Sequence, residues 1–167
     1  IFQTNGTTEA MRIDSSQNVG VSSTPSGWRS DFSAIQVGYA GGLSATTADG
    51  AASSVWLSGN VYHDGSVFKY INTASDEASL FSMQDGAFLW QSASAGTGGN
   101  TATMNSKMTL TSAGNVGIGT AAPSAKLEVE QANNAHAFRV ISATDDNWKA
   151  NISIEGEIGI LRLYADG

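Results

Sequence analysis

The 167-residue chain contains no cysteine, so neither a disulfide framework nor a thiolate metal site is available to it. Charged residues make up only 14% of the sequence, against roughly 25% in ordinary soluble domains. The net charge is −7 and the basic residues are scattered singly, so no basic patch is available for nucleic acid. No apolar run is long enough for membrane insertion, and no signal-peptide pattern is present. A surface poor in charge suits β-structure that packs against copies of itself, because little charge has to be desolvated.

Helix signals are almost absent as well. Even the window 127–154, which has neither Gly nor Pro, alternates apolar and polar residues as strands do. Asp64-Gly65 and Asp85-Gly86 each lie between short apolar runs, a pattern that predicts hairpins closed by two-residue type I′ turns. Asp49-Gly50 is a further turn signal. We therefore expect an all-β fold of short antiparallel strands and hairpins.

The middle of the chain, residues 28–106, is predicted to form a small antiparallel β domain, similar to a sandwich or flattened barrel. The Gly-rich stretch 94–100 is expected to be a loop leading out of this domain. Its expected strands are 34–39, 54–57, 61–63, 67–71, 80–84 and 87–91.

Two stretches that flank this domain have nearly the same sequence. Residues 11–25, MRIDSSQNVGVSSTP, align with residues 108–123, MTLTSAGNVGIGTAAP, with one residue inserted before the second proline. The copies are 97 positions apart, which is too long for the 20–50-residue period of a solenoid. We interpret them as connectors, 1–27 and 107–125, that mark module boundaries. A further β domain, truncated at Gly167, would begin at 126 and include a weaker third copy at 152–160. We interpret the chain as a segment of a longer protein.

Each connector is predicted to be a strand, a turn and a returning strand. One such hairpin buries too little apolar surface to be stable in water, whereas three copies around an axis can bury their apolar stripes on one another. The alternative is that the hairpins pack on the neighbouring domain as ordinary strands. The predicted intersubunit axis contacts are Met11, Ile13, Val19, Val21, Met108, Leu110, Val116 and Ile118.

The second connector and the residues that follow it resemble a known sequence repeat. The string from Met108 to Val129, MTLTSAGNVGIGTAAPSAKLEV, resembles a repeat of tail fibres and other structural proteins of tailed bacteriophages. The first copy departs from the pattern at Gln17 and Ser22, where the second has glycine. The resemblance implies an elongated homotrimeric fibre of the virion, extracellular when assembled, that contacts other tail or virion proteins and supports host attachment.

Candidates for chemistry are few. Asp76-Glu77 and Asp145-Asp146 are adjacent carboxylates, but neighbours on a strand point to opposite faces and neighbours in a turn usually face water. His63 and His136 have no local ligand partner and are interpreted as surface or packing residues. The Gly-rich segment 96–99 lacks the Lys-Ser/Thr of a phosphate loop. No catalytic residue, metal or cofactor is therefore predicted, and the chain is not expected to be an enzyme.

The tryptophans leave a binding function open. Trp56 and Trp90 fall in expected strands and are predicted to be core residues, whereas Trp28 follows the first connector and is the better candidate for an exposed or intersubunit aromatic. Trp28 is accordingly the possible contact for a host surface glycan. The alternatives to a structural fibre segment are a receptor- or glycan-binding module of the same fibre and a polysaccharide-depolymerising tailspike.

Overall fold

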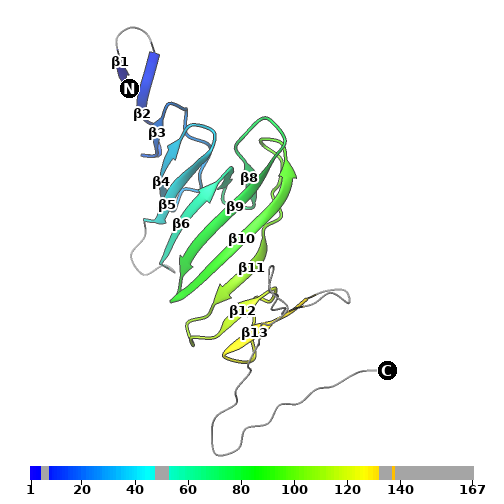
Figure 1. Cartoon of the computed structure of the whole chain (residues 1–167). Helices are drawn as coiled ribbons and strands as arrows, with labels where there is room; N and C mark the ends of the chain where they lie inside the picture. Colours follow the sequence, from blue (N-terminus) through cyan, green and yellow to red (C-terminus); the bar gives the residue numbers. More distant parts are fainter. Residues whose placement is uncertain (5–7, 48–52, 132–136, 138–167) are drawn as a thin grey trace, which may run out of the picture.

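The computed structural model of the chain describes residues 1–4, 8–47, 53–131 and 137. That part is all-β and contains no helix, as the sequence predicts (Figure 1). Its strands are β1 (Phe2–Thr4), β2 (Thr8–Ile13), β3 (Val19–Val21), β4 (Phe32–Val37), β5 (Gly41–Thr46), β6 (Ser54–Gly59), β7 (Val61–His63), β8 (Phe68–Tyr70), β9 (Asp76–Gln84), β10 (Ala87–Gly96), β11 (Asn105–Leu110), β12 (Val116–Ile118) and β13 (Leu127–Val129).

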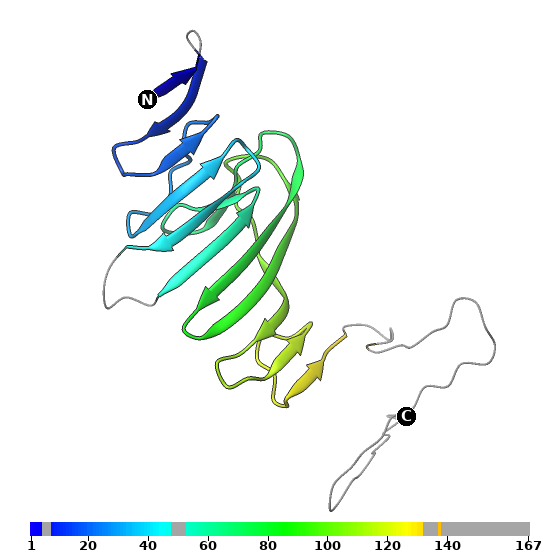
Figure 2. The ribbon, with the colours of Figure 1, turned by 60° about the vertical axis from the view of Figure 1, so that its left-hand side comes forward.

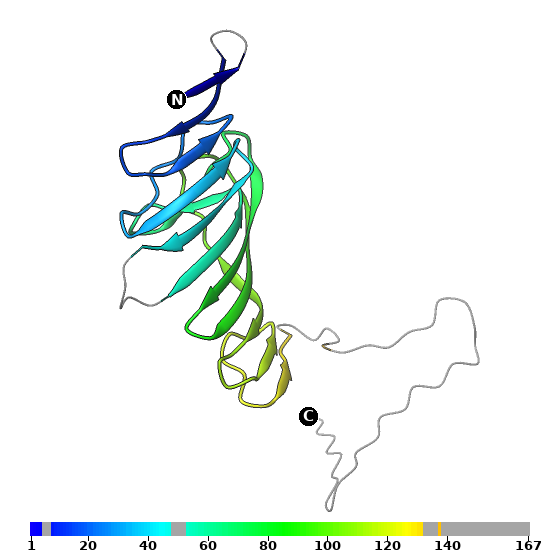
Figure 3. The same ribbon diagram turned by 90° about the vertical axis from the view of Figure 1, so that its left-hand side faces the viewer.

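Eleven of these strands form one twisted sheet in the order β1-β2-β3-β4-β5-β6-β9-β10-β11-β12-β13. Neighbours are antiparallel except for the pairs β3–β4 and β12–β13, which are parallel. The strands stack one after another along the long direction of the described part, with β1 at one end and β13 at the other (Figures 2 and 3). The sheet therefore runs without a break through both connectors and the strands between them.

The second layer is the two-stranded hairpin β7–β8, which packs on one face of the long sheet. Two clusters of buried side chains lie beneath it, and Phe68 and Met104 pack against both. We call this the covered face of the sheet. Its buried apolar residues include Phe32, Ala34, Trp56, Leu80 and Ala93, and the prediction that Trp56 is a core residue is confirmed.

Every expected strand of the middle region has a counterpart, but two parts of the prediction were wrong. Strand β5 was not predicted, because it opens on Gly41-Gly42 and has no apolar run to mark it. Strand β10 continues to Gly96 and so includes part of the expected loop 94–100. The glycine at its end leaves room for Tyr70, since a Cβ there would lie 2.2 Å from the ring.

The turn at Asp85-Gly86 confirms the predicted type I′ hairpin. Gln84 pairs with Ala87, and the two residues between them have φ angles of 51° and 76°. Positive φ at both central residues defines this turn type, which matches the twist of the strands that it joins.

The hairpin at Asp64-Gly65 is also confirmed, although its turn is not the two-residue type. His63 pairs with Phe68, which leaves a four-residue loop. The carboxylate of Asp64 accepts hydrogen bonds from the backbone N–H groups of Ser66 and Val67, at 2.8 and 2.9 Å. This side chain therefore closes the wider loop by the local bonding that Asp offers in turns.

Several sequence predictions lie outside the described residues. They are Asp49-Gly50, His136, Asp145-Asp146 and the weaker third copy at 152–160.

Candidate functional site: the open face of the sheet

The two sequence copies fold into hairpins with the same register. In the first, Met11 pairs with Val21 and Ile13 with Val19. In the second, strand β11 pairs with β12 at the positions 97 residues further on. The duplication is therefore structural as well as sequential.

The turns of the two copies use equivalent hydrogen bonds. Asp14 N–H donates to the carbonyl oxygen of Asn18, and Thr111 N–H donates to that of Asn115, both at 2.9 Å. The backbone N–H of Asn18 also donates to the Asp14 carboxylate at 2.8 Å, and the backbone N–H of Asn115 donates to the Thr111 hydroxyl at 3.1 Å. Asp14 and Thr111 differ in charge, but each has a side-chain oxygen that accepts this hydrogen bond. The two copies therefore form equivalent turns.

The glycine of the Asn-Val-Gly core is required sterically. A Cβ on Gly20 would lie 2.1 Å from the carbonyl oxygen of Ser23 and 2.8 Å from Cδ of Pro25. A Cβ on Gly117 would lie 2.5 Å from the carbonyl oxygen of Thr120. Because the chain folds back over this glycine in both copies, the residues between glycine and proline can turn towards the next strand.

That next strand completes a three-stranded unit in each copy. It runs parallel to the second hairpin strand, with Gly38 N–H donating to Val21 O at 2.9 Å and Glu130 N–H donating to Ile118 O at 2.8 Å. The sequence predicted strands near 34–39 and after 126, but not that they pair with the connectors.

The first copy keeps this backbone despite its two departures. Gln17 and Ser22 have φ angles of 67° and 54°, and their counterparts Gly114 and Gly119 have φ angles of 76° and 80°. The first copy therefore holds two ordinary residues in a left-handed conformation that glycine adopts without strain.

All eight predicted axis contacts project from the same face of the sheet. Directly paired residues share a face and alternate residues along a strand return to it, so the pairing registers settle this point. The side chains are half-buried or exposed; Ile13 is 57% exposed and Ile118 is 43% exposed. This is the face opposite the covered face, and we call it the open face.

An uninterrupted line of apolar residues crosses the open face. Each member lies directly opposite the next one on the neighbouring strand, over ten consecutive strands. We call this line the apolar row; it consists of Ile13, Val19, Ile35, Leu43, Leu57, Phe81, Trp90, Met108, Ile118 and Val129. A second line beside it, Ala45, Val55, Met83, Phe88, Leu110, Val116 and Leu127, is also apolar.

The apolar row contains large side chains that remain open to solvent. Leu57 is 60% exposed, Leu43 is 48% exposed and Ile35 is 47% exposed. In β4 the alternation is complete, since every residue of the covered face is buried and every residue of the open face is exposed. Large contiguous apolar surfaces of this kind mark interaction sites in soluble proteins.

Two tryptophans are placed opposite to expectation. Trp90 is 38% exposed on the open face, 5.0 Å from the ring of Phe81, so the prediction of a core residue was wrong. The pairing of Trp90 with Phe81 and Met108 fixes it to the apolar row.

Trp28 is only 6% exposed, so the prediction of an exposed aromatic was wrong as well. Its Nε1–H donates to the side-chain oxygen of the buried Gln36 at 3.2 Å, and its ring packs over Gly42. A buried indole with its polar atom already bonded offers no face on which a sugar could stack.

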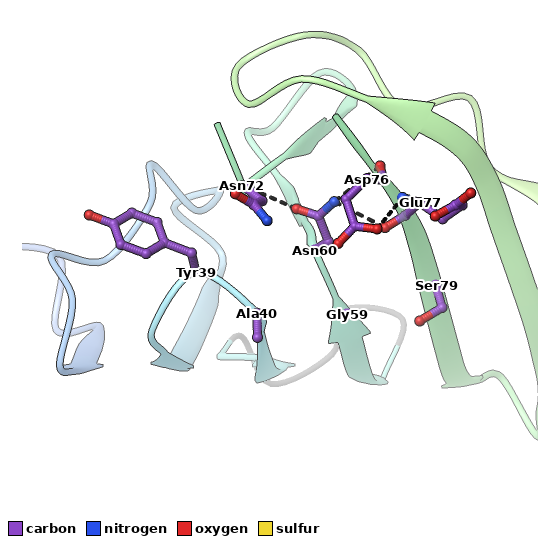
Figure 4. Close-up of a pocket in the computed structure, with 8 residues that line it drawn as sticks. All are labelled: Tyr39, Ala40, Gly59, Asn60, Asn72, Asp76, Glu77 and Ser79. Carbon is purple, nitrogen blue, oxygen red and sulfur yellow. Dashed lines mark hydrogen bonds between the residues drawn. The ribbon is translucent and has the colours of Figure 1, made fainter. Parts of the chain in front are cut away.

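The adjacent carboxylates Asp76 and Glu77 line a pocket of about 390 Å³ where β6 ends and β9 begins (Figure 4). Asn60 also lines this pocket. Its Nδ2 donates to the carbonyl oxygens of Asp76 and Glu77 at 3.3 and 3.0 Å, and its Oδ1 accepts from Asn72 N–H at 2.7 Å. These bonds join three chain segments, so the pocket has a structural explanation.

His63 packs between aromatic rings, at 4.8 Å from Phe68 and 5.8 Å from Trp56. Gly65 N–H donates to its Nδ1 at 3.0 Å, and burial lowers the pKa of its imidazole. Within residues 1–4, 8–47, 53–131 and 137, no group of three or more His, Asp or Glu side chains could hold a metal ion. No helix in the same ranges could cross a membrane.

A scan against protein-family models finds no match for this chain, and a search of curated proteins finds no significant similarity.

Proposed function

We propose that the chain is a structural, non-enzymatic segment of a homotrimeric fibre, of the kind that tailed bacteriophages carry on the virion to support host attachment. One observation carries this proposal: the connector occurs twice with the same geometry, and both copies direct their apolar side chains to one open face. Repetition of an exposed apolar surface along an elongated chain is expected where that surface meets other subunits.

The energy available on this face is substantial. Full burial of a Leu or Ile side chain stabilises by about 1.5–3 kcal/mol. Six residues of the apolar row are between 38% and 60% exposed, so covering them would contribute on the order of 5 kcal/mol per chain before the cost of association. Of these six exposed residues, only Ile13 and Ile118 belong to the connectors.

Copies of the same chain are the occupants that fit best. No member of the apolar row is charged, so two identical rows can meet without repulsion or unpaired buried charge. An identical chain also presents apolar surface over the same length. The glycan-binding alternative named Trp28 as its possible contact, and that residue is only 6% exposed.

Light scattering on the whole chain tests the proposal. We expect a mass about three times the 17.2 kDa of one chain. Ile118→Glu should lower the mass, because it brings three carboxylates together on a desolvated axis. The matched control is Val67→Glu, an exposed residue in the β7–β8 loop on the other side of the sheet, which should leave the mass unchanged. A stable monomer of the unaltered chain in dilute solution would contradict the proposal.

Immunogold microscopy tests the place of the chain in a virion. An antibody against the chain should label a projecting fibre on phage particles from the source of the sequence. Labelling confined to cells that hold no particles would count against a virion protein.

A further inference from the structure

The apolar row does not stop at the connectors. Five of its members, Ile35, Leu43, Leu57, Phe81 and Trp90, belong to the strands between them. We infer that the subunit interface follows the whole row, with three chains parallel and in register and with the fibre axis along the direction in which the strands stack. This inference rests on the proposed trimer and adds the strands of the middle region to its interface.

The middle strands are open on one side only. Ala34, Trp56 and Leu80 are buried on the covered face, and Phe68 of β8 packs against the cluster that contains Trp56 and Leu80. Their neighbours Ile35, Leu57 and Phe81 project to the open face, where no described segment lies over them. The middle region therefore completes its core inside the chain and still has an apolar surface to bury.

The middle strands supply more of the apolar surface on the open face than the connectors do. Ten strands at a spacing of about 4.8 Å extend over about 43 Å, and two adjacent lines of side chains cover a width of about 13 Å. The flat area is on the order of 550 Å² per chain before side-chain relief is added, and in a trimer each chain shares this area between two neighbours, whereas each partner in a standard two-chain interface contributes roughly 800 Å². The connectors alone cover less than half of that length.

Symmetry then fixes direction and register. Three identical chains with identical surroundings are related by rotation about one axis. If the apolar row of every chain faces that axis along its whole length, the row must run parallel to it, and rotation keeps each residue at its own level. Leu57 then meets Leu57, and Trp90 meets Trp90. Such like-with-like contacts are compatible only with uncharged residues, which is what the row contains.

Cysteine cross-linking can test this arrangement because the natural chain has no cysteine. Single variants Ile13→Cys, Leu57→Cys and Ile118→Cys place one thiol near each end and one at the middle of the row. Facing sheets lie about 10 Å apart, whereas a disulfide needs Cα atoms within about 7 Å, so a short bismaleimide is the appropriate linker. Val67→Cys, exposed in the β7–β8 loop, is the control.

We expect all three row variants to form covalent dimers of like chains in up to two-thirds of the molecules, and Val67→Cys to form almost none. If Ile13→Cys and Ile118→Cys formed cross-links but Leu57→Cys did not, the inference would be wrong, although the proposed trimer would remain supported. If only Leu57→Cys formed cross-links, the chains would be antiparallel and the inference would be wrong. The same conclusion would follow if Ile13→Cys chains formed cross-links with Ile118→Cys chains in a mixture of the two. A trimeric mass with no row cross-link also overturns it, whereas a monomeric mass overturns the proposed function itself.

Discussion

The glycine of each connector offers a sharp test of how the connector is built. Gly20→Ala adds a Cβ at 2.1 Å from Ser23 O and 2.8 Å from Pro25 Cδ, far inside the 3.5–4.0 Å of a normal contact. Gly117→Ala places its Cβ at 2.5 Å from Thr120 O. Neither glycine has a positive φ, so the cost is one of contact and not of backbone conformation.

The expected loss of local stability is about 1–3 kcal/mol, the usual cost of overpacking, and Gly20→Ala should lie nearer the upper end because its contacts are shorter. A loss of about 1.4–2.8 kcal/mol corresponds to about 10- to 100-fold faster hydrogen exchange through local opening. The amides to follow are Gly38 N–H for the first copy and Glu130 N–H for the second, since each bonds to a connector carbonyl.

Gly27→Ala is the matched control. It belongs to the same connector as Gly20, yet a Cβ on Gly27 would have no neighbour within 4 Å. Its effect should be within about 0.5 kcal/mol. If Gly20→Ala exchanged at the same rate as Gly27→Ala, the steric explanation of the Asn-Val-Gly core would be refuted.

Three further predictions follow from single side chains. Asn60→Ala should lower the free energy of unfolding by about 2–4 kcal/mol in urea titrations, because it leaves three backbone groups without their partner; a loss below about 0.5 kcal/mol would contradict this. The backbone N–H groups of Val67 and Ser66 lower the pKa of Asp64 to about 2. The ionised carboxylate should therefore stabilise the fold above about pH 4, and this stabilisation should be lost as the pH falls towards 2. A titration of the Asp64 carboxyl group by NMR with a midpoint near 3.8 would contradict the hydrogen bonds of that loop. Gly119→Ser should lower the melting temperature, because a Cβ at 119 would lie 2.1 Å from Glu130 O. The reverse exchange in the first copy, Ser22→Gly, should change the melting temperature less. Equal changes in melting temperature for the two variants, measured by calorimetry, would contradict this prediction.

Local patterns in the sequence were sufficient for the elements and for part of the open face. Alternation and the Asp-Gly pairs predicted the expected strands of the middle region, although not β5, and both hairpins. The repeated connectors predicted eight side chains on one face, because the period of two along a strand needs only the hairpin register.

What the sequence did not predict depends on pairing between distant strands. A shift of one residue in register moves a side chain to the other face, so the placement of Trp90 could not be read from its own strand. Trp28 is buried and donates a hydrogen bond to the buried Gln36, a polar residue that no hydrophobic pattern marks as interior. Asn18 similarly accepts a hydrogen bond from Ala34 N–H at 3.0 Å and joins the first connector to β4.

A density map of the assembled chain from electron microscopy tests the central claim most directly. We expect threefold symmetry, with three sheets whose apolar rows face the axis and whose strands lie across the fibre direction at a spacing of about 4.8 Å. A map without threefold symmetry, or one in which the strands run along the fibre and the open faces point outwards, would contradict the account.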